Sequence, residues 1–157
     1  YSQLTRLPPP RPVAVALPAL LDKVARLDAR RPVQLEPGPS VTVNVDADQL
    51  EQALINLVRN AVEASLPVGG EVLLRWREEP DRVVIEVLDE GEGPPISDNL
   101  FVPFFTTKPG GSGIGLALAR QVAEAHEGGV SLLARTDTPG AVATLWLPRP
   151  PDHQEPP

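Results

Sequence analysis

Apolar residues recur along this chain with two different periods, and their order predicts a mixture of helices and strands. Three segments have the three-and-four spacing of an amphipathic helix: 18–27, 46–64 and 114–125. Six shorter apolar segments are typical of strands: 33–35, 41–45, 71–76, 82–88, 130–134 and 141–147. Helices interspersed among hairpins predict an α/β fold, a two-layer sandwich with a mixed, mostly antiparallel sheet on one side and three helices on the other.

The composition sets the limits of this domain. The chain has 157 residues, 20 of them proline, and neither Cys nor Met. This length supports one hydrophobic core, and the lack of Cys excludes cysteine chemistry. Prolines gather at both ends, so we expect a linker over 1–16, a globular domain over 17–148 and a disordered Pro-rich tail over 149–157. No apolar stretch is long enough to cross a bilayer, which favours a cytoplasmic location.

The charge balance argues against nucleic acid as a partner. The chain carries 21 acidic and 14 basic residues, for a formal net charge of −7 at pH 7. Binding to a phosphate backbone depends on clustered Lys and Arg, and the sequence contains no basic run. Its two lysines are Lys23 and Lys108.

The helix predicted over 46–64 has a polar face that is unusual in composition. Gln52, Asn56, Arg59, Asn60 and Glu63 fall within one sector, roughly opposite the apolar stripe. Most such faces are simply solvated. Asn is unfavourable inside a helix, however, so two Asn residues one turn apart indicate a need for neutral amide oxygens, which are suitable ligands for Mg²⁺.

The sequence DEGEG at 89–93 follows a predicted strand and enters a long loop. In isolation these residue types are typical of a turn, and their spacing does not fit a calcium-binding loop. As a binding element, Asp89 would present a carboxylate that accepts a hydrogen bond from an exocyclic amine. Gly91 and Gly93 would let a flat ring approach the backbone.

The sequence GGSGIG at 110–115 directly precedes the third predicted helix. Backbone N–H groups converge at a helix start, so an anion could bind there. The motif is not a P-loop, because no Gly-Lys-Ser/Thr follows, and it lacks the usual spacing of a dinucleotide fingerprint. A nucleophile elbow is also excluded, since Ile114 replaces its second Gly. Ser112 is better interpreted as a helix cap or a phosphate donor.

Between these two Gly-rich motifs lies the segment 101–108, FVPFFTTK, which contains every Phe in the chain. We expect the Phe side chains to pin the loop to the core, and Lys108 to meet a phosphate. His126 comes near the end of the third predicted helix, where a capping role is the default and catalysis is much less favoured.

The order of these motifs resembles the catalytic and ATP-binding domain of sensor histidine kinases, a branch of the GHKL superfamily with the Bergerat fold. The N box is similar to 52–64, the G1 box to 89–93, the F box to 101–108 and the G2 box to 111–116. The phrases FFTTK and NAVEA look most like the nitrogen-regulation type of kinase.

The resemblance implies a role for each matching residue. Asn60 would coordinate the Mg²⁺ that bridges the phosphates of ATP, with Asn56 on the same wall, and Asp89 would accept a hydrogen bond from the adenine amino group. The remaining nucleotide contacts would come from the two glycines of the G1 box, two lid residues and the G2 box: Gly91, Gly93, Thr107, Lys108, Gly111, Ser112, Gly113, Gly115 and Leu116. A cavity joining Asn60 to Asp89 is therefore expected.

The implied function is donation of the ATP γ-phosphoryl group to a His on a separate dimerisation domain, for relay to a response regulator. No candidate His precedes Asn56, so 1–7 is interpreted as the end of an upstream hairpin, and this chain alone is expected to be a monomer. ATP-hydrolysing relatives have a Glu where Asn56 stands, which disfavours hydrolysis. Glu63 also departs from the pattern, because many sensor kinases have a basic residue there.

Two other functions stay open at this point. Serine kinases of the anti-sigma-factor type share the same boxes. A non-catalytic module could use the same pocket to change its affinity for a partner when the nucleotide is exchanged.

Overall fold

The computed structural model describes residues 7–28, 30–93 and 114–149 of the chain. In this part the elements follow one another in the order β1 (Val13–Ala16), α1 (Leu17–Ala25), β2 (Val33–Leu35), β3 (Thr42–Val45), α2 (Ala47–Ser65), the 3₁₀ helix η2 (Leu66–Val68), β4 (Val72–Glu78), β5 (Arg82–Leu88), α3 (Ile114–Ala125), β6 (Gly129–Ala134) and β7 (Ala141–Pro148). None of the helices described is long and apolar enough to cross a membrane.

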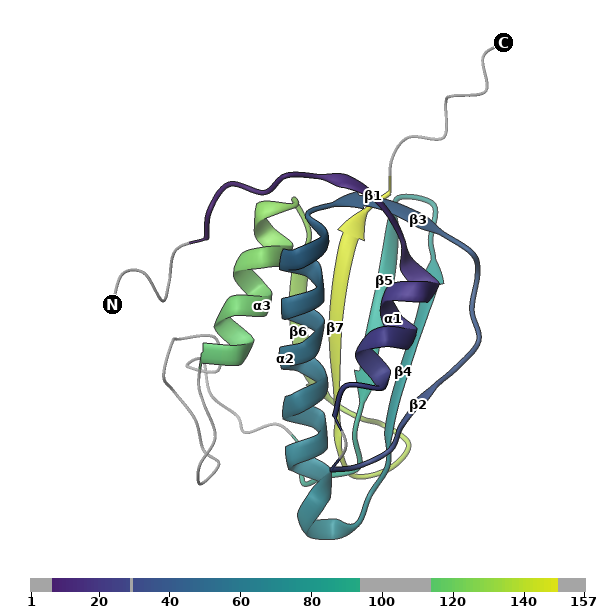
Figure 1. Cartoon of the computed structure of the whole chain (residues 1–157). Helices are drawn as coiled ribbons and strands as arrows, with labels where there is room; N and C mark the ends of the chain where they lie inside the picture. The colour runs from purple at the N-terminus through teal and green to yellow at the C-terminus, as the bar shows by residue number, and fades with distance from the viewer. Residues whose placement is uncertain (1–6, 29, 94–113, 150–157) are drawn as a thin grey trace.

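Five strands form the main sheet, in the order β2, β4, β5, β7, β6. β2 pairs with β4 in parallel, and the other three pairs are antiparallel. Helices α1, α2 and α3 cover one face of this sheet (Figure 1). The predicted α/β sandwich, with a mixed and mostly antiparallel sheet packed on three helices, is confirmed.

One strand was not predicted. β1 lies inside the segment expected to be a linker and pairs with β3, with Val13 opposite Val45 and Ala16 opposite Thr42. β2 and β3, which follow each other in the chain, therefore belong to different sheets. The pattern of β1 is only four residues long and mostly exposed, so its pairing with a strand 29 residues later leaves little trace in the sequence.

The core lies between the helices and the sheet. The apolar stripe of α2 is buried, and Leu50, Leu54 and Leu57 are among its members. Inward-facing residues of the central strands, such as Ile85 and Leu145, belong to the same cluster. Because one helix face is fixed against the sheet in this way, the polar residues of α2 can be turned only toward its neighbours or toward solvent.

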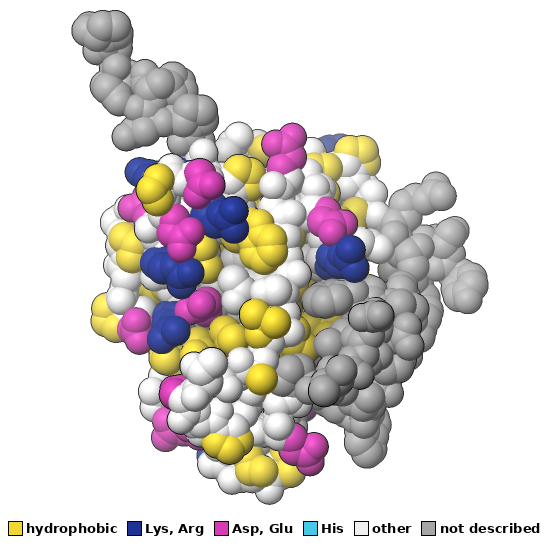
Figure 2. All heavy atoms as spheres, turned by 180° about the vertical axis from the view of Figure 1, so that it is seen from behind, with side chains coloured by type: hydrophobic (Ala, Val, Ile, Leu, Met, Phe, Trp, Pro, Cys, Tyr) yellow, Lys and Arg dark blue, Asp and Glu magenta, His cyan; other side chains and the backbone are white. Residues whose placement is uncertain are grey.

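On the described part of the opposite face of the sheet, charged and apolar side chains are interspersed at the surface (Figure 2). Arg75 and Arg77 both pair with Glu86 on the neighbouring strand, at 2.7 and 3.3 Å. The guanidinium of Arg82 lies 5.5 Å from the ring centroid of Trp146. These contacts make this face a polar surface of the domain, distinct from the helical face.

Asp46 and His126 join three separate segments at the start of α2. Asp46 caps α2 by accepting a hydrogen bond from the Gln49 N–H, and its other oxygen accepts one from the Arg11 N–H at 2.9 Å. The Asp46 N–H donates to Nε2 of His126 at 3.0 Å, and Nδ1 of His126 lies 2.8 Å from the Val122 carbonyl. Nε2 is placed to accept from the Asp46 N–H, and Nδ1 is placed to donate to the Val122 carbonyl. The capping role expected for His126 is confirmed.

Replacing His126 tests the contribution of this junction to stability. In His126→Leu the Asp46 N–H and the Val122 carbonyl lose a partner in a partly buried place, so we expect the free energy of unfolding to fall by about 1–3 kcal/mol. Urea unfolding measures the change. Glu124→Gln, which removes an exposed ion pair within α3, is the control and should change the free energy of unfolding by less than about 0.5 kcal/mol. Equal values for the two variants would contradict the assigned role.

Candidate functional site

The two Asn residues of α2 lie on a side of the helix that is only partly open. Asn56 is buried, with 8% of its surface exposed, and Asn60 is half-buried. They are four residues apart, so their amides are stacked along the helix with a rise of about 6 Å between them. Gln52 and Arg59, in the same predicted polar sector, are exposed. The helix therefore presents two neutral amides next to each other, at the edge of its buried face.

Asp89 follows directly after β5 and is held by backbone donors. It is 6% exposed, and its Oδ1 accepts hydrogen bonds from the N–H groups of Gly91 and Ala141, at 2.9 and 3.2 Å. Its own N–H donates to the Ala141 carbonyl at 3.0 Å. These bonds fix the direction in which the carboxylate points. A carboxylate has about four acceptor positions, so two bonds at Oδ1 are compatible with further acceptance.

Gly91 brings this strand end against the last turn of α2. A Cβ at position 91 would lie 2.5 Å from the Ala64 carbonyl oxygen and 2.9 Å from the Ala64 Cβ, so only a glycine fits. The next contact is between the Glu90 N–H and Oγ of Ser65, at 3.4 Å. The Asp89 segment therefore lies level with the C-terminal end of α2. Measured along the helix axis, Asn60 is about 6 Å from this level and Asn56 about 12 Å.

Two residues that the sequence reasoning missed complete this corner. Gly140 has φ +137°, and a Cβ there would lie 2.1 Å from the Asp89 carbonyl oxygen. Nη1 of Arg135 donates to that same carbonyl at 3.1 Å, while its hydrogen bonds with Asp137 raise the pKa of the guanidinium. The sequence places Gly140 at the end of a turn before the last predicted strand, but it does not indicate that Gly140 is a neighbour of Asp89. Nothing in the sequence connects Arg135 to Asp89, 46 residues away.

The other predicted site residues are placed only in part. Thr107, Lys108, Gly111, Ser112 and Gly113 lie outside the described residues, as does the whole F box. Their roles stay predictions. Gly93 has φ +101°, which favours glycine, and the chain leaves the described part just after it. Gly115 and Leu116 belong to the first turn of α3, and Leu116 packs against the core. α3 packs beside α2, so the first turn of α3, which contains the end of the G2 box, lies on one side of the helix that carries Asn56 and Asn60.

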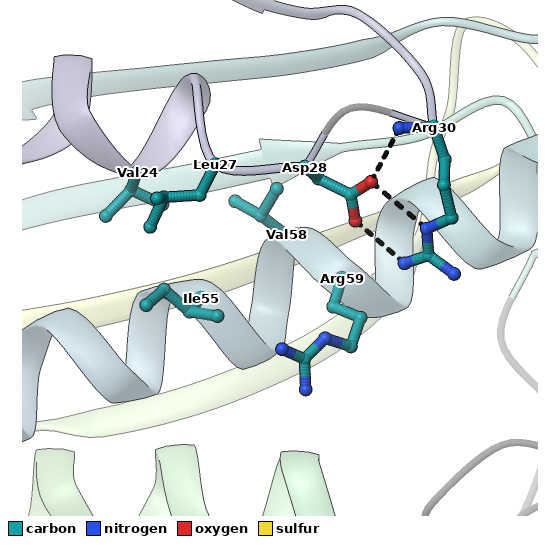
Figure 3. A pocket seen from close by; sticks show the side chains of 7 residues that line it. All are labelled: Val24, Leu27, Asp28, Arg30, Ile55, Val58 and Arg59. Atoms are coloured by element: carbon teal, nitrogen blue, oxygen red, sulfur yellow. Dashed lines mark hydrogen bonds and ion pairs between the residues drawn. The ribbon is translucent and has the colours of Figure 1, made fainter.

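A groove of about 340 Å³ lies between α1 and α2 on the outer side of the helical layer (Figure 3). It is lined by apolar and charged side chains: Val24, Leu27, Asp28, Arg30, Ile55, Val58 and Arg59. Three hydrogen bonds from Arg30 hold the pKa of Asp28 below its ordinary value. This groove is not the expected cavity between Asn60 and Asp89. The F box and most of the G2 box, which would close that cavity, lie outside the described residues, so it stays a prediction.

The described residues contain no group of three or more His, Cys, Asp or Glu that could hold a metal ion. The amide pair of α2 is a different kind of donor set. Mg²⁺ is commonly bound through one or two protein ligands, with substrate phosphates and water supplying the rest. The side chains of Asn56 and Asn60 fit that kind of partial coordination.

A comparison with protein families decides where this arrangement belongs. Residues 45–151 match the family described as histidine kinase-, DNA gyrase B-, and HSP90-like ATPase. The chain belongs to this family. The matched part includes both Asn residues of α2 and the strand end with Asp89, so the family assignment and the site cover the same region.

Within this ATPase family the chain is similar to sensor histidine kinases. The sensory histidine kinase/phosphatase NtrB of Escherichia coli O157:H7 is 40% identical over 116 residues, 66% of this chain and 32% of the relative. The chain spans 23% to 32% of the length of the curated relatives it matches first. The catalytic domain of the histidine kinase ThkA has a TM-score of 0.78 and 27% identity, covering 88% of this chain and 95% of that one.

A second solved structure is that of full-length ShkA in complex with AMPPNP, with a TM-score of 0.73 and 28% identity. The match covers 87% of this chain and 30% of ShkA. Together these comparisons confirm the predicted resemblance to a histidine kinase catalytic domain, and the match to NtrB supports the nitrogen-regulation type.

Gly91→Ala tests the contact between the strand end and α2. The added Cβ would collide with backbone atoms of Ala64, so α2 or the strand end must shift, and we expect the free energy of unfolding to fall by about 1–3 kcal/mol. Glu92→Ala, at the exposed neighbouring position, is the control and should behave as wild type. Chemical denaturation measures both. A Gly91→Ala variant as stable as the control would contradict the close approach.

Proposed function

We propose that this domain binds Mg-ATP between α2 and the end of β5, and that it donates the γ-phosphoryl group to a His on a separate dimerisation domain of the same kinase. A response regulator would then take the phosphoryl group from that His. The chain spans only part of its relatives, so the His-bearing domain belongs to the part of such kinases outside this similarity.

The observation that carries the proposal is the position of Asp89 relative to the two amides. A buried carboxylate lies level with one end of α2, and the amides of Asn60 and Asn56 follow about one and two turns further along the same helix. A nucleotide whose adenine amino group donates to Asp89 would extend its phosphates along α2, toward the amides. The support comes from the spacing between Asp89, Asn60 and Asn56 along α2, and no single one of these residues provides it.

Asn60 is the residue that would hold Mg²⁺, with Asn56 lining the same wall of the site. An amide oxygen is hard and neutral, so it would bind the metal without adding negative charge next to the phosphates. When bound, Mg²⁺ neutralises part of the charge of the transferring phosphoryl group.

The remaining demands of phosphoryl transfer are positioning and charge stabilisation, and the chain needs no nucleophile of its own for these. Gly91 and Gly93 would let the adenine approach the backbone. Gly115 and Leu116, at the start of α3, would contribute to the phosphate side together with the lid and G2 residues predicted from the sequence. Membership of an ATPase family and the binding of AMPPNP, an ATP analogue, by ShkA both support ATP as the nucleotide.

The similarity to kinases named for histidine favours that acceptor over the serine acceptor of anti-sigma-factor-type kinases. In the transfer the bond between the γ-phosphorus and the bridging oxygen breaks, and a bond to an imidazole nitrogen of the acceptor forms. ADP leaves with the electron pair of the broken bond.

Asp89→Asn tests the adenine contact directly. An Asn side chain retains an oxygen that can accept from the Gly91 and Ala141 N–H groups, but it replaces the other carboxylate oxygen by a donor that opposes the adenine amine. We expect the affinity for Mg-ATP, measured by calorimetry, to fall at least about tenfold. Asp81→Asn, at an exposed turn, is the matched control and should bind as wild type does. Unchanged binding by Asp89→Asn would remove the main support of the proposal.

A further inference from the structure

Arg59 precedes Asn60 on α2 and projects from the outer side of the helix. Its side chain is exposed, and it lies at the edge of the groove between α1 and α2. Figure 3 shows its guanidinium directed away from Asp28 and α1, toward the side of α2 on which α3 lies. α3, which begins at the G2 box, packs against α2 on this side.

The neighbouring charges are already paired with one another. Arg30 forms two side-chain hydrogen bonds with Asp28, at 3.0 and 2.7 Å, and an ion pair with Glu63 at 3.5 Å. Arg59 interacts with Asp28 only through longer-range charge attraction. Within the part of the chain that the structure describes, the Arg59 guanidinium makes no hydrogen bond and no ion pair. In a protein with a net charge of −7, such a cation is available to an anionic ligand.

The height of Arg59 along α2 indicates which part of a nucleotide it meets. Arg59 lies about 1.5 Å beyond the level of Asn60 and about 8 Å beyond Ala64, where the Asp89 segment packs. A nucleotide held at Asp89 by its adenine has its terminal phosphate furthest along this direction. Along the helix axis, Arg59 lies between Asn56 and Asn60. Around the axis it is turned about 100° from Asn60, toward solvent. A phosphoryl group must be accessible from this side if an acceptor is to reach it.

We propose that Arg59 contacts the terminal phosphate of bound ATP and thereby distinguishes ATP from ADP. This inference rests on the proposed function and adds a residue to it. The planar guanidinium donates two parallel hydrogen bonds to phosphate oxygens, and it stabilises the charge that spreads over them during transfer. The pairing of Glu63 with Arg30 supports this assignment, because it partly neutralises the one acidic side chain of the polar sector of α2.

Nucleotide binding by the present chain tests the contact without any acceptor His. Affinities for Mg-ATP and Mg-ADP are measured by calorimetry for wild type, Arg59→Gln and Arg59→Lys. We expect Arg59→Gln to weaken Mg-ATP binding about tenfold and to leave Mg-ADP within about twofold of wild type. Arg59→Lys retains the charge but loses the paired donors, so its affinity for Mg-ATP should lie between those of wild type and Arg59→Gln. Arg26→Gln removes another exposed positive charge, at the end of α1, and is the control.

The possible results separate this contact from the proposed function. If wild type binds neither nucleotide, the proposed function fails and the contact fails with it. If wild type binds both, and Arg59→Gln weakens them equally or leaves both unchanged, only the contact is overturned. A loss of the same size in Arg26→Gln would also overturn it, because the effect would then come from overall charge.

Discussion

The close approach of Gly91 to the last turn of α2 is the contact on which the candidate site depends. Backbone meets backbone there, since a single added carbon would lie 2.5 Å from the Ala64 carbonyl oxygen. The neighbouring Asp89 is fixed at the same time by two backbone N–H donors. As a result, the distance between a buried carboxylate and the amides of α2 is set by the packing of a strand end on a helix, and flexible side chains have little influence on it.

The electrostatics of the helical face follow a simple division. Among the described residues, the buried carboxylate of Asp89 lies at the end of the candidate site where the base is proposed to bind. The two amides of α2 and the guanidinium of Arg59 lie at the end proposed for the phosphates. Glu63 lies on the same helix but is paired with Arg30. In the proposed binding mode, the described side chains of the polar sector of α2 add no uncompensated negative charge near the phosphates, which favours the binding of a highly charged nucleotide by an acidic domain.

Most of the fold could be predicted from the sequence, because hydrophobic period is a local property. The helices over 46–64 and 114–125 were expected and occur as α2 and α3, and the strands expected over 71–76 and 82–88 occur as β4 and β5. The pairing of β1 with β3 and of β2 with β4 could not be predicted in the same way. Both join segments far apart in the chain, and three or four residues carry too little pattern to name a partner.

The sequence by itself determined the residue types of the site and their order: two amides one helical turn apart, an Asp with two glycines at a strand end, and a Gly-rich helix start. These follow from local propensity, which a single segment can express. Only the tertiary structure decided that Gly140 lies against the Asp89 backbone and that Arg135 donates to its carbonyl. It also decided that Arg30 is paired while Arg59 makes no hydrogen bond or ion pair with any of the residues that the structure describes. Such contacts depend on which strands and helices become neighbours, and burial of the whole core sets that arrangement.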